Sequence, residues 1–273
     1  MLREMLENVR IKSPLIHNIT NYVTVNDCAN ILLACGGNPI MADDIGEAEE
    51  ITSVCDGLNI NIGTLNQRTI PAMLAAGKRA NTLGHPVVLD PVGAGASKLR
   101  TETALTLLKE VKFSVIRGNM SEIKTLASGS GSTRGVDAGI LDRVTKENLG
   151  QAVAFAKEFS CKTGAVIAIT GAIDIVSDQK KAFCIYNGHP DMSRVTGTGC
   201  QLSAMTAAYA AANPDTALTA AAASVCAMGL CGEIARSRMS AEDGNASYRN
   251  YIIDAVFRLT GENLEKGAKY EMR

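Results

Sequence analysis

Short apolar runs alternate along most of the chain with longer stretches in which apolar residues recur at helical spacing. The short runs are rich in valine, isoleucine and leucine and have the length of buried strands, whereas the longer stretches repeat apolar residues three and four positions apart. The pattern predicts strands at 14–17, 39–41, 57–63, 86–90, 113–117 and 165–170, and helices at 21–34, 45–54, 65–83, 101–109, 149–159 and from 119 onwards.

This alternation of strands and helices indicates a mainly parallel central sheet with helices on both faces, a three-layer α/β fold. Segments 174–177 and 181–186 flank Asp178-Gln179-Lys180 and predict a hairpin that adds antiparallel edge strands. Residues 200–257 are mostly helical in pattern, and the Gly- and Ser-rich segment 128–137 predicts a surface loop. Because no internal repeat or linker divides the chain, residues 1–273 are predicted to form a single domain.

Composition narrows the classes of function. The formal net charge is -1 and only 4% of the residues are aromatic, which argues against a nucleic-acid partner. Residues 217–230 are the most apolar region, but small polar residues interrupt them, so they predict a buried helix and not a membrane span. Residues 1–12 lack the apolar core of a signal peptide. We therefore expect a cytoplasmic protein.

The glycine-rich turn Val195-Thr196-Gly197-Thr198-Gly199-Cys200 leads directly into an Ala-rich helical stretch. Such a turn exposes backbone N–H groups, and the start of a helix adds a partial positive charge. Both features stabilise bound phosphate groups. Cys200, expected at the first helical position, places an ionisable thiol beside this site. The turn therefore predicts phosphoryl transfer.

Polar residues follow several of the predicted strands, at the end where ligands bind in open parallel sheets. Asp90 comes directly after Val-Val-Leu; its carboxylate either holds a hydrated Mg²⁺ or closes the strand as a turn residue. Arg117 offers a bidentate fork for phosphate oxygens. Asn119 and Glu122 have the spacing of a capping box, and Glu122 could instead share a metal-bound water with Asp90.

Three further residues each allow two interpretations. Thr170 ends a predicted buried strand, so its hydroxyl either binds a phosphate or is an ordinary strand-end hydroxyl. Met41 either contacts a ligand or fills a gap in the core. Cys200 is either a thiolate that acts as a general base or a small buried residue that lets the turn approach closely.

Six motifs occur in a fixed order that identifies a resemblance. They are Asn18-Ile-Thr-Asn21-Tyr-Val-Thr, Asn38-Pro-Ile-Met41-Ala, Asp90-Pro-Val-Gly-Ala-Gly95, Arg117-Gly-Asn-Met-Ser-Glu122, Ile169-Thr170-Gly171 and Val195-Thr-Gly-Thr-Gly-Cys200. Together they closely resemble the hydroxyethylthiazole kinase family, the thiamine-salvage branch of the ribokinase-like superfamily. The match extends from about His17 to the C-terminal helices.

The resemblance implies a ribokinase-like fold and ATP-dependent phosphorylation of the hydroxyl of 4-methyl-5-(2-hydroxyethyl)thiazole, with Mg²⁺, in thiamine biosynthesis and salvage. It also implies a homotrimer with substrate sites between neighbouring subunits. The implied site residues are Met41, Gly197 and Asn21 for the substrate, Arg117 and Thr170 for ATP, Asp90 and Glu122 for Mg²⁺, and the amides of Gly197, Thr198 and Gly199, beside Cys200, for the transferring phosphoryl group.

One position departs from the wider superfamily. Sugar kinases of this superfamily usually have an aspartate base where this chain, like the thiazole kinase branch, has Cys200. Since a loose phosphoryl-transfer transition state needs little activation of its nucleophile, we expect Cys200 to contribute modestly to the rate.

Three other functions remain open at this point: a kinase for a sugar or pyrimidine alcohol, a lyase that repairs hydrated nicotinamide nucleotides, and a nucleotide sensor without turnover. The first two are expected to carry aspartate at position 200. The chain has neither a P-loop motif nor a Gly-x-Ser-x-Gly elbow, which excludes two other common types of site.

Overall fold

The computed structural model describes residues 1–129 and 143–273, and its strands form one sheet in the order β2-β1-β3-β4-β5-β6-β7-β8-β9. The bounds are β1 (Leu15–Ile19), β2 (Asn38–Met41), β3 (Gly57–Asn61), β4 (Val87–Asp90), β5 (Val115–Asn119), β6 (Val166–Thr170), β7 (Asp174–Ser177), β8 (Ala182–Ile185) and β9 (Tyr270–Met272). Strands β1 to β6 pair in parallel, and β7, β8 and β9 extend the sheet as antiparallel strands. The predicted parallel sheet and its antiparallel hairpin are confirmed.

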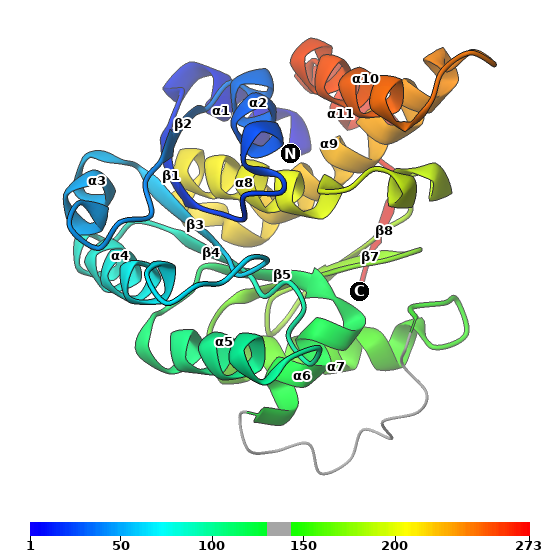
Figure 1. The fold of residues 1–273 in the computed structure, drawn as a ribbon. Coiled ribbons are helices and arrows are strands. Elements are labelled where there is room, and N and C mark those ends of the chain that lie inside the picture. Colours follow the sequence, from blue (N-terminus) through cyan, green and yellow to red (C-terminus); the bar gives the residue numbers. More distant parts are fainter. Residues whose placement is uncertain (130–142) are drawn as a thin grey trace.

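Helices cover both faces of the sheet (Figure 1). The core on one side of the sheet includes α1 (Leu2–Lys12), α2 (Val25–Cys35), α8 (Thr198–Ala212), α9 (Ala217–Arg238), α10 (Asn245–Arg258) and α11 (Gly261–Gly267). The core on the other side includes α3 (Ala48–Val54), α4 (Thr69–Leu83), α5 (Lys98–Glu110), α6 (Met120–Gly129) and α7 (Leu149–Thr163). Strand side chains alternate between the two cores, with Val88 in the first and Leu89 in the second. The three-layer prediction therefore holds.

The structure differs from the predicted elements in four places. An N-terminal helix, α1, and a C-terminal strand, β9, extend the predicted set. Helix α8 begins at Thr198, with Gly197 as its N-cap, so Cys200 is the third helical residue and not the first. Of the predicted loop 128–137, Ser128 and Gly129 end α6, and the remainder lies outside the described residues.

Helix α9 corrects the expectation that no stretch of the chain could span a bilayer. Within the described residues, Pro214–Arg238 is long and apolar enough to cross a membrane by length and composition. However, 72% of its apolar window is buried inside the protein, where α9 packs on α8, α10 and the sheet. Its apolar surface is therefore used in the core, as the buried-helix prediction for residues 217–230 required.

Candidate functional site

The carboxyl ends of the parallel strands bring most of the predicted site residues to one edge of the sheet. Asp90 ends β4, Met41 ends β2, Thr170 ends β6, and Arg117 lies two residues before the end of β5. The glycine turn that precedes α8 reaches the same edge, because α8 packs across β1, β3 and β4. Parallel pairing therefore assembles a site from motifs far apart in the sequence.

Asp90 is the centre of this site. Its carboxylate is fully buried and accepts hydrogen bonds from Arg117 Nη1 at 3.2 Å, Asn61 Nδ2 at 2.8 Å and Ser203 Oγ at 2.9 Å. Burial raises the pKa of Asp90; the Arg117 charge opposes that shift and the nearby Glu122 adds to it. Because Arg117 and Asn61 can only donate here, the geometry fits the ionised carboxylate.

Two asparagines connect Asp90 to Cys200, and their neighbours fix how each amide is oriented. The backbone N–H of Gly63 donates to Asn61 Oδ1 (2.9 Å), so the Asn61 amide nitrogen must face Asp90. The backbone N–H of Thr24 donates to Asn21 Oδ1 (3.1 Å), so Asn21 Nδ2 faces Asn61 Oδ1 at 3.0 Å and Cys200 Sγ at 3.2 Å.

This orientation settles the role of the Cys200 sulfur in the network. Since Asn21 Nδ2 is a donor, the sulfur accepts this hydrogen bond. The sulfur lies in the first turn of α8 and accepts this hydrogen bond there. At the same time Cys200 is only 9% exposed. Cys200 is therefore a packed residue whose sulfur takes part in the hydrogen-bond network of the turn.

The two glycines of the turn have different steric roles. Gly197 has φ +86°, and a Cβ there would overlap the side chain of Thr24 at the start of α2. Gly199 is helical, but a Cβ there would overlap Nη2 of Arg117. The Arg117 guanidinium therefore lies directly on the backbone of the first turn of α8. Its Nε is buried and has no hydrogen-bond partner within the part of the chain that the structure describes.

These contacts together form a candidate anion site. The N–H groups of the first turn of α8, which have no intrahelical acceptors, and the Arg117 guanidinium form one positively polarised surface. The free Arg117 Nε and the fork of the guanidinium suit phosphate oxygens. Glycine at position 199 allows this contact, because a Cβ there would overlap the guanidinium and move it away from the helix.

Glu122 joins two loops at this edge and forms the predicted capping box. Its Oε2 accepts the N–H of Asn119 (2.8 Å), while Asn119 Oδ1 accepts the N–H of Glu122 (2.9 Å). Its Oε1 accepts the N–H of Gly93 from the loop after β4 (2.9 Å). Glu122 is therefore a structural cap that also lies within electrostatic range of Asp90.

The remaining predicted residues lie around this centre. Thr170 is half-buried, with its hydroxyl 3.5 Å from the Gly118 carbonyl, so it is only loosely held. Met41 is half-buried and packs on the core beside α8. The segment after Met41 is fixed by His17, which contacts the Ala42 carbonyl through Nε2 (2.8 Å). Burial lowers the pKa of His17, so this ring is a neutral structural element.

Sequence reasoning assigned no role to several residues that complete the site: Thr24, Asn61, Arg100, Asp174 and Ser203. Ser203 could have been predicted from the sequence, since it lies three residues after Cys200 and hence on the same face of α8. Asn61 ends a strand at the predicted edge. Arg100 bonds the carbonyls of Gly63 (2.6 Å) and Val92 (3.3 Å), a link between loops that only the fold reveals.

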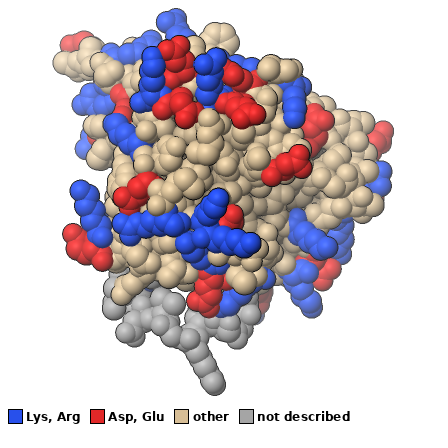
Figure 2. Space-filling view, turned by 180° about the vertical axis from the view of Figure 1, so that it is seen from behind, with Lys and Arg blue, Asp and Glu red and all other residues tan. Residues whose placement is uncertain are grey.

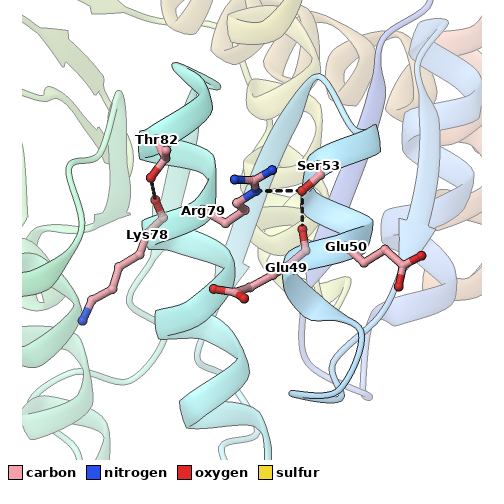
Figure 3. Close-up of a pocket in the computed structure, with 6 residues that line it drawn as sticks. All are labelled: Glu49, Glu50, Ser53, Lys78, Arg79 and Thr82. Carbon is pink, nitrogen blue, oxygen red and sulfur yellow. Dashed lines mark hydrogen bonds between the residues drawn. The ribbon is translucent and has the colours of Figure 1, made fainter.

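A hollow of about 410 Å³ lies elsewhere, between α3 and α4 (Figure 3). Each of its cations already has a polar partner: Arg79 donates to the neutral Ser53 Oγ (2.8 Å), and Lys78 lies 3.0 Å from Glu110. On the face opposite that of Figure 1, acidic and basic side chains are intermixed with uncharged surface between them (Figure 2). Neither feature resembles the anion site at the start of α8.

The fold and the site define a class of protein. The chain shares its fold with a ribokinase-like superfamily protein from Enterococcus faecalis, with a TM-score of 0.63 at 12% identity over 94% of this chain and 89% of that one. This likeness shows a ribokinase-like α/β fold.

Closer relatives give the family. The model of the hydroxyethylthiazole kinase family matches residues 6–262. A hydroxyethylthiazole kinase from Clostridium acetobutylicum is 69% identical over 271 residues, 99% of each chain. The structure of the hydroxyethylthiazole kinase from Pyrococcus horikoshii has a TM-score of 0.89 at 35% identity and covers 100% of this chain and 98% of that one. This chain belongs to the hydroxyethylthiazole kinase family, which confirms the resemblance found in its motifs.

Proposed function

We propose that this chain transfers the γ-phosphoryl group of ATP to the hydroxyl of 4-methyl-5-(2-hydroxyethyl)thiazole in thiamine biosynthesis. The observation that carries the proposal is the contact of the Arg117 guanidinium with the backbone of Gly199 at the start of α8, in a chain of this family. Phosphoryl transfer depends mainly on positioning and on stabilising charge. The Arg117–Gly199 surface supplies both.

The other residues take roles that follow from their positions. Arg117, fixed by Asp90, and Thr170 would bind the nucleotide at the β5–β6 side of the edge. Asn21 and Met41, from the β1–β2 side, would contact the thiazole together with Gly197. The N–H groups of residues 197–199 would bind the phosphoryl oxygens as they gain charge.

A magnesium ion fits this site if it is held through its water molecules. Asp90 accepts three hydrogen bonds and Glu122 accepts two, which leaves both carboxylates acceptor capacity for metal-bound waters. Mg²⁺ usually keeps several waters in nucleotide sites. Among the described residues, no group of three or more His, Cys, Asp and Glu side chains could hold a metal directly. Bound Mg²⁺ would neutralise charge on the phosphate oxygens.

The test is a coupled assay of ADP release with the purified chain. We expect release only when ATP, the thiazole alcohol and Mg²⁺ are all present, and much slower release with pyridoxal or ribose as the alcohol. ATP binding without ADP release would support the nucleotide-sensor function and overturn the proposal. In the same assay Cys200→Ala should remain active, with a loss no larger than the ~10²–10⁴-fold that general bases provide.

We also propose a cytoplasmic homotrimer with substrate sites between subunits. The support is apolar surface next to the site: Tyr22 and Val23, which follow Asn21, are 77% and 58% exposed, and Ile45, close after Met41, is 53% exposed. A second copy would bury these side chains. Light scattering should give three times the 28.7 kDa of the chain, and Tyr22→Ser with Val23→Ser should lower that mass. A monomeric wild type would contradict the trimer.

A further inference from the structure

Asp174 is a carboxylate at the nucleotide side of the site that the proposed function does not use. It begins β7, and in the antiparallel pairing Ile175 lies opposite Ile169, which places Asp174 beside Thr170. Thr170 in turn pairs with Asn119 at the end of β5, two residues after Arg117. Paired residues in a sheet point to the same face. Asp174, Thr170 and Arg117 therefore share the face of the sheet that α8 and α9 cover.

The Asp174 carboxyl is half-buried and has few partners. Its Oδ1 accepts the N–H of Gly171 (2.8 Å), which braces the turn directly after Thr170. The charged or titratable groups of the described residues that act on it are Arg117 from β5 and the Cys226 thiol from α9. On β8 its paired neighbour is Ile185, which is apolar. Arg117 is therefore the cation that an ionised Asp174 would face.

We propose that Asp174 is a positioning residue of the nucleotide site, and that its charge competes with the nucleotide phosphates for Arg117. When the carboxyl is neutral, the full positive charge of Arg117 is available to ATP. When it is ionised, part of that charge is compensated before the nucleotide arrives, so ATP binds more weakly. This inference rests on the proposed role of Arg117 and Thr170 in binding ATP.

The competition between Asp174 and the nucleotide phosphates for Arg117 should change near neutral pH, where Asp174 changes its charge. Burial raises the pKa of Asp174 to about 7, against the opposing effects of the Gly171 N–H and the Arg117 charge. The affinity for ATP should therefore fall as the pH rises through about 7. An interaction worth one pKa unit corresponds to a tenfold change in affinity, so we expect about a tenfold effect.

The experiment measures ATP binding by calorimetry between pH 6 and 8.5 for the wild type and Asp174→Asn. Asparagine keeps an oxygen acceptor for the Gly171 N–H but carries no charge. Because ATP and Mg²⁺ titrate equally in both samples, the ratio of the two dissociation constants isolates Asp174. We expect a ratio near one at pH 6, and Asp174→Asn to bind about tenfold more tightly at pH 8.5.

Asp178 provides a matched control, because it is half-buried like Asp174 and also accepts backbone N–H groups, from Lys180 and Lys181, but it follows the opposite end of β7. Asp178→Asn should follow the wild type at every pH. If Asp174 only braces the turn, Asp174→Asn will match the wild type throughout while Asp174→Ala binds more weakly at every pH, and the inference fails. If the wild type binds no ATP at any pH, the proposed function fails with it.

Thermal unfolding gives a second readout that needs no nucleotide. A carboxyl whose pKa is raised on folding contributes stability at low pH and loses it as the pH rises from its ordinary value of 3.8 to about 7. The unfolding temperature of Asp174→Asn relative to the wild type should therefore increase across that range. A constant difference would contradict the charge that the inference assigns to Asp174.

Discussion

Replacing Gly199 by alanine is expected to lower kcat/KM for phosphoryl transfer by about 10²- to 10³-fold, the cost of losing one preorganised donor to a developing anion. The backbone of Gly199 is helical, so alanine is compatible with its φ and ψ. The expected effect is steric, because the new Cβ would occupy the position of Arg117 Nη2. The guanidinium must then leave the helix start, and its hydrogen bond to Asp90 is broken or lengthened.

The chain provides a close control for this substitution. Gly150 is the second residue of α7, and no atom lies within 4 Å of the Cβ that alanine would add. Gly150→Ala should keep full activity and raise the free energy of unfolding by roughly 0.5–1 kcal/mol, because alanine is the better helix former. Steady-state kinetics should be measured for both variants. Full activity in Gly199→Ala would show that catalysis does not depend on the contact between Arg117 and the start of α8.

Much of this site could be predicted from sequence because strand ends in a parallel sheet converge. Asp90, Arg117 and Thr170 each follow or end a clear apolar run, and the turn at 197–199 carries its own signature of glycines before a helix. Those features depend on local sequence, which determines where strands end and where the chain must turn tightly. The capping box of Asn119 and Glu122 is local in the same sense, and the structure contains it.

The contacts between these residues could not be predicted in the same way. That the Arg117 guanidinium rests on Gly199 depends on how α8 crosses the sheet, 82 residues further along the chain. The orientation of Asn21 toward Cys200 depends on the Thr24 N–H, which requires three-dimensional geometry. Asp174 was missed because segment 174–177 was assigned to a hairpin with 181–186, and its pairing with β6 was not part of that prediction. Such relations arise from packing and not from any one stretch of sequence.

The buried pair of Asp90 and Arg117 leads to the second large effect, on stability. Asp90→Ala should lower the free energy of unfolding by about 3–5 kcal/mol, because it leaves a charged guanidinium without its partner in a buried site. The Asp90 side chain is 0% exposed and the Arg117 side chain 7% exposed, so bulk solvent screens the remaining charge weakly. The donors of Asn61 and Ser203 also lose their acceptor. Urea unfolding at one fixed protein concentration measures the change.

A double variant separates this electrostatic cost from the role of the pair in the reaction. Adding Arg117→Met to Asp90→Ala removes the uncompensated charge, and replacing both members of a buried ion pair by apolar side chains is often close to neutral. We therefore expect the double variant to recover most of the lost stability while remaining inactive in the ADP-release assay. If Asp90→Ala has the same free energy of unfolding as the wild type, the Arg117 charge is better solvated than its burial indicates. If the double variant is no more stable than Asp90→Ala, the cost comes from the orphaned Asn61 and Ser203 donors and not from the arginine charge.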